Sequence, residues 1–277
     1  ANLTAAVDSV HGAGGDEAKH LLHALGVKLH HLYAEPTGDF PHTPEPTKEN
    51  LVELSEQTAK LGADVGFAQD PDADRLAVVD ENGTYIGEEY TLALCALHKL
   101  KAGESIAANL STSRMVDDIA DRVNGKVIRT PVGEANVTQG MRDHNCTLGG
   151  EGNGGIIDNR VSQVRDSIIG MAYILELIAS RKQKLSDIVK DIPAYAIVKD
   201  KADVDPAVLE TMPEKMQAAF ADQKIDLQDG VRIDWPDKWV HVRPSNTEPI
   251  IRVIAEASDE TQAKALVQQV RDVLGLS

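Results

Sequence analysis

The stretch QDPDADR, residues 69–75, decides the fold, because it sets three carboxylates between two apolar runs. The runs at residues 63–68 and 76–79 have the length and composition of buried strands in an α/β sheet. An extended backbone has a side-chain period of two, so it would turn all three acids to one side. The three acids are Asp70, Asp72 and Asp74. Because converging like charges repel unless a cation neutralises them, and because carboxylate oxygens suit Mg²⁺, we predict a magnesium site at the carboxyl end of this strand.

Two other interpretations of this stretch were weighed. The simpler one is a polar turn whose acids are solvated. The sharper one is a calcium-binding EF-hand loop, because Glu81 falls at its twelfth position. That loop needs a glycine at its sixth position and a helix on each side, whereas Arg75 stands there and a β-branched run follows. The pattern therefore excludes an EF-hand.

The composition excludes several classes of protein. The 277 residues carry a formal net charge of -16, which repels phosphate backbones, so we expect no nucleic-acid partner. The two cysteines, Cys95 and Cys146, form neither a disulfide framework nor a zinc pattern, which favours the reducing cytoplasm. No charged segment with an apolar core opens the chain, and the longest apolar helix, at residues 168–179, is too short to cross a bilayer. We therefore expect no membrane partner.

Strand-like and helix-like segments alternate through the first two thirds of the chain, and they do so in two successive units. The first βαβαβ unit closes with a turn at residues 81–83, and the second ends with the helix at 166–180. The last third instead predicts an antiparallel sheet covered by helices. We therefore predict two related doubly wound α/β domains, residues 1–86 and 87–191, followed by an α+β domain, residues 192–277.

Several loops of the second unit could contact a ligand. Residues 151–155 contain too many glycines for a strand and predict a loop that a ligand can approach closely. The side chains of Glu151 and Asn153 suit sugar hydroxyls, although a flexible turn is an equal alternative. Residues 130–134 and 111–114 end strands of the same domain and could line the same cleft. Helix capping explains the hydroxyls at 111–113 equally well.

The last domain contains a second polar loop, the stretch RPSNTEP at residues 243–249. It places a guanidinium, two hydroxyls and an amide around a turn with free backbone N–H groups. Arginine matches a phosphate with two parallel hydrogen bonds, and consecutive amides can cradle an anion. Arg252 would add charge nearby. We predict a phosphate-binding loop, with an ordinary polar turn as the alternative.

Taken together, three motifs resemble the α-D-phosphohexomutase family, which includes phosphoglucomutase, phosphomannomutase and phosphoglucosamine mutase. The motifs are the aspartate loop (residues 70–75), the Gly-Gly-Glu-x-x-Gly stretch from Gly149 and the phosphate loop, in this order and at these intervals. Residues 40–46, 130–133 and Arg165-Asp166 also match. The resemblance covers the whole chain. It implies that this chain is similar to the second, third and fourth of the family's four domains. It implies a four-stranded sheet in the last domain.

The resemblance assigns roles to individual residues. It implies that the three aspartates bind Mg²⁺ and that Arg75 lies beside the transferred phosphoryl group. Sugar recognition is assigned to Glu151 and Asn153, with Thr130 and Gly133 expected to line the same cleft. The residues expected to hold the phosphate that is not transferred are Arg243, Ser245, Asn246, Thr247 and Arg252. The substrate implied is a hexose phosphate that moves its phosphate between the 6 and 1 positions.

Some positions depart from the family pattern. The phosphorylated serine of the family's first domain has no counterpart in this sequence, so we expect an inactive fragment whose missing partner is that N-terminal domain. Gly155 stands where many relatives have His, and Asn153 where many have Ser. These departures leave the sugar open. We favour glucosamine phosphate, with the mannose and glucose phosphates as alternatives.

Two other classes of function remain open. A phosphatase with Asp72 as nucleophile and Asp74 as acid shares the strand-then-Asp-x-Asp pattern, but it would have Gly-Thr or Gly-Val where Arg75-Leu76 stands. A non-catalytic sugar-phosphate-binding protein fits if the chain is naturally complete. A homodimer is compatible with the sequence in each case.

Overall fold

The computed structural model describes residues 2–245 and 250–276 and contains three β-sheets in two compact units. The first unit comprises Ala1–Arg129 and Gly133–Pro193, and the second comprises Thr130–Val132 and Ala194–Ser277. Both four-stranded sheets belong to the first unit and the third sheet to the second. The domain boundaries that we place at residues 86 and 191 therefore remain a proposal.

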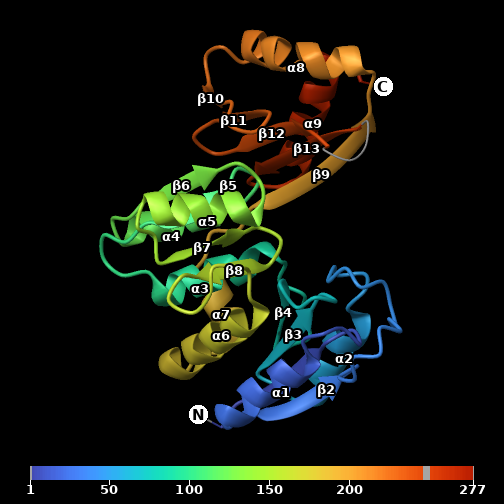
Figure 1. Ribbon diagram of the computed structural model, residues 1–277, viewed down its shortest axis with the longest axis vertical. Coiled ribbons are helices and arrows are strands. Elements are labelled where there is room, and N and C mark those ends of the chain that lie inside the picture. The colour runs from blue at the N-terminus through green and yellow to red at the C-terminus, as the bar shows by residue number, and fades with distance from the viewer. Residues whose placement is uncertain (1, 246–249, 277) are drawn as a thin grey trace. The chain divides into compact units, whose positions relative to one another are not determined.

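The first sheet has the strand order β2-β1-β3-β4 (Figure 1). Its elements are β1 (Thr4–Asp8), α1 (Gly15–Ala24), β2 (Lys28–Leu32), α2 (Val52–Lys60), β3 (Val65–Gln69) and β4 (Leu76–Asp80). Strand β1 pairs in parallel with β2 and β3, whereas β4 runs antiparallel to β3. Every residue of β3 and β4 is buried, as their apolar stretches at 65–68 and 76–79 predict, and so are the polar residues that end them, Gln69 and Asp80. From these runs we expect strands at residues 65–69 and 76–80, and both bounds are confirmed.

The second sheet repeats this order as β6-β5-β7-β8 (Figure 1). Its elements are α3 (Glu89–Lys99), β5 (Ile106–Asn109), α4 (Met115–Arg122), β6 (Val127–Thr130), α5 (Glu134–Asp143), β7 (Leu148–Glu151), β8 (Gly155–Asp158), α6 (Ser167–Arg181) and α7 (Leu185–Val189). Strand β7 pairs in parallel with β5 and antiparallel with β8. The last strand of each sheet is thus antiparallel to its neighbour, and the predicted relation between the two α/β domains is confirmed.

The glycine-rich segment of this sheet is more regular than predicted. Only residues 152–154 form a loop, because Glu151 ends β7 and Gly155 begins β8. The bare backbone permits close packing: a Cβ on Gly149 would meet Met141 Sδ at 2.5 Å, and one on Gly150 would meet Gly155 O at 2.3 Å. Glycine in a strand marks such close approaches, so the expectation of a loop over all of 151–155 is wrong.

The second unit contains an antiparallel sheet with the order β10-β11-β12-β13-β9. Its elements are β9 (Ala196–Asp203), α8 (Pro206–Ala219), β10 (Lys224–Asp226), β11 (Val231–Asp234), β12 (Trp239–Pro244), β13 (Ile250–Ala257) and α9 (Glu260–Leu274). The α+β prediction is confirmed, but the sheet has five strands rather than four. The additional strand is β10, whose three residues are too few to give a sequence pattern; Ile225 pairs with Ile233 and packs against the core.

The core of the second unit lies between its sheet and its two helices. Met216 of α8, Val242 of β12 and Val270 of α9 are fully buried in one hydrophobic cluster. Across the ranges 2–245 and 250–276, no helix is both long and apolar enough to cross a membrane.

Candidate functional site

The aspartate loop connects β3 to β4 and brings its three carboxylates together. One oxygen from each of Asp70, Asp72 and Asp74 lies within 4.8 Å of the others. The convergence was predicted, but its cause is different. The backbone turns here instead of extending: Ala73 N donates to Asp70 O at 3.0 Å, and Ala73 has a left-handed φ of 59°. A left-handed residue reverses the chain direction, so residues on both sides of Ala73 can face one another.

A glycine-rich turn before α1 packs against the aspartate loop. Ala13 N donates to Pro71 O at 2.8 Å, and a Cβ on Gly12 would lie 2.5 Å from that same oxygen. A Cβ on Gly14 would lie 2.5 Å from Ala73 Cβ. Only glycine allows the two loops to approach this closely.

A chain of side-chain hydrogen bonds also holds the aspartate loop in place. Ser9 Oγ donates to Gln69 Oε1 at 2.8 Å, and Gln69 Nε2 donates to Ser167 Oγ at 2.8 Å. Ser167 Oγ in turn donates to Ala73 O at 2.6 Å. Since Ser167 is the first residue of α6, this helix begins directly at the aspartate loop, and its N-terminal dipole favours negative charge there.

Arg75 lies within the acid cluster. Its Nε lies 2.6 Å from Asp70 Oδ2, and its backbone N donates to Asp70 Oδ1 at 3.0 Å. Its Nη1 lies 2.9 Å from Glu45 Oε1, in the proline-rich segment. Burial alone would lower the pKa of the guanidinium, but the hydrogen bonds and charges of Asp70 and Glu45 outweigh it and raise the pKa. Arg75 is therefore a fixed cation beside Asp70, one of the three acids of the cluster.

Glu151 is the residue of the predicted sugar site with the most polar contacts among those that the structure describes. It is 3% exposed, and its Oε1 accepts hydrogen bonds from Asn109 Nδ2 at 2.7 Å and from Gly133 N at 3.0 Å. Its Oε2 lies 2.6 Å from Arg165 Nη1. A buried carboxylate is stable only when its lone pairs are satisfied in this way. The structure therefore brings Glu151 and Gly133 together.

The sugar loop, residues 152–154, lies against the start of β4. Leu76 N donates to Gly154 O at 3.1 Å. Within the loop, Asn153 Oδ1 accepts from Gly155 N at 3.2 Å, which orders the turn. Thr130 is 5% exposed, and its Oγ1 donates to the neighbouring Pro131 O. Sugar contacts of Asn153 and Thr130 thus stay predictions.

The predicted phosphate loop is only partly described. Asn246 and Thr247 lie outside the described residues. Arg243 of β12 pairs in register with Arg252 of β13, so both side chains project from the same face of the sheet. Ser245 N donates to Ile250 O at 2.9 Å. The two arginines and Ser245 are therefore brought together, while their phosphate contact stays a prediction.

Two neighbours shape the charge around Arg243. Its Nη1 lies 4.0 Å from Asp229 Oδ2, which also accepts from Val132 N at 3.0 Å. Among the described residues, the buried Nε of Arg243 has no hydrogen-bond partner. Burial lowers the pKa of His241 to about 4, so this histidine is neutral at physiological pH. The guanidinium of Arg243 thus keeps a donor for an anion.

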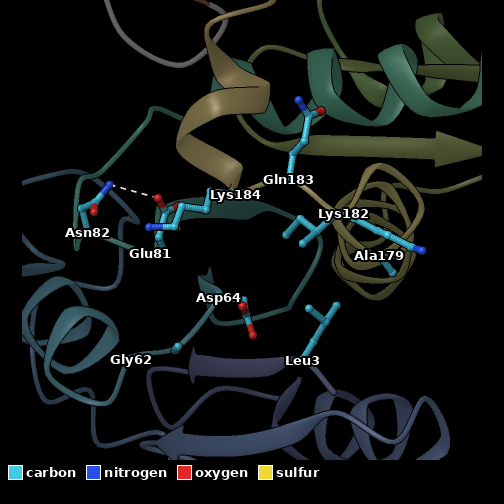
Figure 2. Close-up of a pocket in the computed structure, with 11 residues that line it drawn as sticks. Leu3, Gly62, Asp64, Glu81, Asn82, Ala179, Lys182, Gln183 and Lys184 are labelled. Atoms are coloured by element: carbon cyan, nitrogen blue, oxygen red, sulfur yellow. Dashed lines mark hydrogen bonds between the residues drawn. The ribbon is translucent and has the colours of Figure 1, made fainter. Parts of the chain in front are cut away.

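A separate pocket of about 520 Å³ lies in the first unit (Figure 2). Its lining includes the acids Asp64 and Glu81 and the lysines Lys182 and Lys184, with Lys184 beside Glu81. Asp64 precedes β3 and Glu81 follows β4, whereas the aspartate loop lies between the two strands. The pocket is therefore at the other end of this strand pair and is not part of the candidate site.

The aspartate loop fits a divalent cation. Asp74 Oδ1 is buried and accepts no hydrogen bond from the described residues, and Arg75 Nε is 3.7 Å away. Asp72 is exposed, so the cluster is open to solvent on one side. Three converging carboxylates, some of whose oxygens accept no hydrogen bond from the described residues, are hard ligands of the kind that Mg²⁺ binds while keeping several waters.

Three supporting residues were not assigned a role from the sequence. Arg165 joins Glu151 to Asp74, whereas the sequence showed only that it matches a family pattern. Gln69 and Ser167 hold the aspartate loop. Only their positions in the sequence could have indicated this role: Gln69 is the last residue of a strand, and Ser167 follows Asp166, which caps a helix.

Comparison with known proteins agrees with this geometry. Three family descriptions match: "Phosphoglucomutase/phosphomannomutase, alpha/beta/alpha domain II" at residues 1–83, the corresponding domain III at 87–195, and the C-terminal domain at 194–273. The phosphoglucomutase/phosphomannomutase of Thermococcus kodakarensis is 40% identical over 95% of this chain, and the probable phosphoglucosamine mutase of Methanopyrus kandleri is 34% identical over 98%. The chain spans 58% and 61% of the lengths of these two relatives.

Solved structures show the same fold. A phosphoglucomutase/phosphomannomutase family protein from Burkholderia thailandensis matches 99% of this chain and 60% of its own, with a TM-score of 0.87 and 26% identity. The N-acetylphosphoglucosamine mutase of Aspergillus fumigatus, solved with GlcNAc-6P and magnesium, has a TM-score of 0.66 over 99% of this chain and 66% of its own, but only 15% identity, which shows the fold alone. The chain belongs to the α-D-phosphohexomutase family of isomerases and carries its domains II, III and IV.

Proposed function

We propose that this chain is the metal-binding and sugar-binding part of a phosphosugar mutase that interconverts hexose 6-phosphates and 1-phosphates. The reaction would proceed through a phosphoserine enzyme and a bisphosphate intermediate. The observation that carries this proposal is the meeting of the aspartate loop and the sugar loop in one unit, joined by the ion pairs of Arg165. The serine would come from the family's N-terminal domain, so the chain alone would turn over no substrate.

The aspartate loop would act on the transferred phosphoryl group. The residues Asp70, Asp72 and Asp74 would hold Mg²⁺, which when bound offsets the charge that develops on the phosphoryl oxygens. Arg75 is fixed by Asp70 and Glu45 and adds a permanent positive charge beside it. Catalysis of this kind depends mainly on positioning and charge neutralisation.

The sugar loop would orient the hexose. Glu151 is held by three donors, so its carboxylate presents a fixed acceptor to sugar hydroxyls. Asn153, Thr130 and Gly133 are the other proposed contacts. We favour a hexosamine phosphate, because the acids around this loop would attract an ammonium group and because several relatives are named probable phosphoglucosamine mutase. Glucose and mannose phosphates are the alternative, in line with the name of the Thermococcus relative.

The second unit would hold the phosphate that is not being transferred. Arg243 and Arg252 share one face of the sheet, and Ser245 begins the loop between their strands. Asn246 and Thr247 complete the proposed set. Because the bisphosphate has to turn around during the reaction, this loop would bind either phosphate in turn.

The chain is proposed to act in the cytoplasm. Both cysteines are free and buried, which agrees with a reducing compartment. A homodimer remains compatible with this proposal.

The direct test is an assay of the longer protein that joins this chain to a phosphoserine domain. We expect conversion of glucosamine 6-phosphate to the 1-phosphate with a kcat/KM above that for mannose and glucose 6-phosphates. The isolated chain should bind sugar phosphate weakly and convert none. Failure of the longer protein on all three sugars would contradict the proposal, and an aspartyl-phosphate trapped at Asp72 would favour a phosphatase instead.

A further inference from the structure

One arginine contacts carboxylates from three different elements of the first unit. Arg165 precedes α6; its Nη1 lies 2.6 Å from Glu151 Oε2 at the end of β7, and its Nη2 pairs with Asp74 Oδ2 in the aspartate loop. Its backbone N also donates to Glu134 Oε2 at 2.8 Å, at the start of α5. Burial alone would lower the pKa of Arg165, but the charges of Glu151 and Asp74 raise it, so the side chain stays a cation.

Gly155 makes room for this arginine. A Cβ at position 155 would lie 2.2 Å from Arg165 Cδ and 2.9 Å from its Cγ. Gly155 does not have a positive φ, so its backbone would accept an alanine without strain. Glycine is therefore needed at position 155 to leave room for the Arg165 side chain and not to allow an unusual backbone conformation of β8.

We propose that Arg165 is a positioning residue that couples the metal-binding loop to the sugar loop. Its guanidinium holds Asp74 by Oδ2 and leaves Oδ1, which accepts no hydrogen bond from any described residue, for the metal. The same guanidinium holds Glu151 of the sugar site. This inference rests on the metal site of the proposed function. It adds that the conformation of the aspartate loop and that of the sugar loop depend on each other through Arg165.

The physical reason lies in the planar fork of arginine. A guanidinium can hold two carboxylates at fixed angles, whereas the ammonium of lysine is a point charge without such direction. Outer partners of metal ligands fix the ligand orientation, and their loss weakens metal binding by about 10–100-fold. Because Asp74 and Glu151 share one guanidinium, a disturbance of either carboxylate moves the arginine that holds the other.

The first test compares Arg165→Lys with Arg181→Lys in the 277-residue chain. Both substitutions keep the charge, and Arg181 forms an exposed ion pair with Asp191 at 2.7 Å, away from the aspartate loop in sequence and contacts. We expect Mn²⁺, measured by calorimetry or by the EPR signal of the free ion, to bind about tenfold more weakly to Arg165→Lys than to the unsubstituted chain. Arg181→Lys should bind Mn²⁺ as the unsubstituted chain does, and circular dichroism should show both variants folded.

The second test uses two variants that leave Arg165 in place. Gly155→Ala should displace the arginine by steric contact alone and weaken Mn²⁺ binding to the same extent as Arg165→Lys. Glu151→Gln keeps an acceptor for Asn109 and Gly133 but loses the ion pair with Arg165. It should weaken Mn²⁺ binding about fivefold in the unsubstituted background and by less than about twofold in the Arg165→Lys background. A residue with a merely structural role would give additive effects.

A metal-free measurement separates failure of this inference from failure of the proposed function. Hydrogen exchange of residues 152–155, without metal, should be faster in Arg165→Lys and in Gly155→Ala than in Arg181→Lys. Equal Mn²⁺ affinities for Arg165→Lys and the unsubstituted chain, or unchanged exchange, would overturn the coupling while the metal site stands. Absence of Mn²⁺ binding to the unsubstituted chain would instead overturn the proposed metal site, and with it this role of Arg165.

Discussion

The two four-stranded sheets place different chemistry at the same position of the same topology. In each sheet the third and fourth strands form an antiparallel pair, β3 with β4 and β7 with β8. The turn of the first pair is the aspartate loop, which contains three acids and one arginine; the turn of the second is the sugar loop, Gly152-Asn153-Gly154. The second turn also contacts the residue that follows the first, because Leu76 N at the start of β4 donates to Gly154 O.

This difference shows that the two repeats contribute different features to the candidate site. The acid-rich turn needs cations, which are supplied by Arg75 within the turn and by Arg165, which precedes α6. The glycine-rich turn instead needs space, because its backbone lies against the first turn and because Gly155 leaves room for Arg165. The first repeat thus contributes the charged side chains, and the second contributes a turn whose backbone can pack closely. The candidate site lies where these two turns are adjacent.

The largest effect is expected where the two turns meet. Gly154 has a φ of 88°, and a Cβ there would lie 2.4 Å from Leu76 O. Gly154→Ala should lower the free energy of unfolding by about 3 kcal/mol, because backbone strain and a clash with fixed backbone add together. The measurement is urea unfolding followed by circular dichroism.

Gly103 provides the matched control for this prediction. It has a similar φ of 81°, but a Cβ there would have nothing within 4 Å. Gly103→Ala should therefore lower the free energy of unfolding by only about 1 kcal/mol, from backbone strain alone. Equal losses in the two variants would show that the contact between the turns adds nothing.

The next effect concerns the acid that no arginine holds. In the ranges 2–245 and 250–276, no ion pair to Asp72 is found, whereas Asp70 and Asp74 are both paired. Asp72→Asn should weaken Mn²⁺ binding at least about tenfold, since it removes a charged ligand. In metal-free buffer the same variant should melt at an equal or slightly higher temperature, because one like charge is gone. A clear loss of metal-free stability would mean that Asp72 has a structural partner.

The smallest effect lies at the far end of the fourth strands, which both end in a buried aspartate, Asp80 and Asp158. Burial alone would raise the pKa of Asp158, but hydrogen bonds from Arg160 and Tyr173 outweigh it and lower the pKa below 3.8. A lowered folded-state pKa gives stability that is present above the unfolded value and is lost as the pH falls through the folded one. Unfolding at a series of pH values should show a shallower loss of stability below pH 4 for Asp158→Asn than for the unsubstituted chain.

At pH 7 the two aspartates should also differ. Asp158→Asn should cost about 1 kcal/mol, a small value because Arg160 is half exposed. Asp80 Oδ1 accepts only from the backbone N–H groups of Asn82 and Thr84 among its described contacts, and an amide oxygen can still accept both. Asp80→Asn should therefore cost less than Asp158→Asn. The reverse order would contradict this comparison.

Much of this organisation could be predicted from the sequence. The apolar runs at residues 63–68 and 76–79 indicated the buried strands β3 and β4, and the repeated alternation of strands and helices indicated two related domains. The three motifs indicated the family. These features are local or follow from spacing along the chain, so a single sequence is enough to read them.

The remaining features depend on contacts between distant residues. Residue type alone indicates neither that Arg165 reaches Asp74, 91 positions away, nor that Gly155 is bare for that reason. The left-handed Ala73 was missed because alanine rarely adopts that conformation, and here hydrogen bonds from both sides impose it. Strand β10 was missed because its three residues gain their order from pairing with β11.

The most direct test is a crystal structure of the chain grown with Mn²⁺, with the ion located by its anomalous scattering. The account predicts one ion about 2.1 Å from an oxygen of each of Asp70, Asp72 and Asp74, while Arg165 still contacts Asp74 and Glu151. An ion bound elsewhere, or no ion at this loop under saturating Mn²⁺, would contradict it.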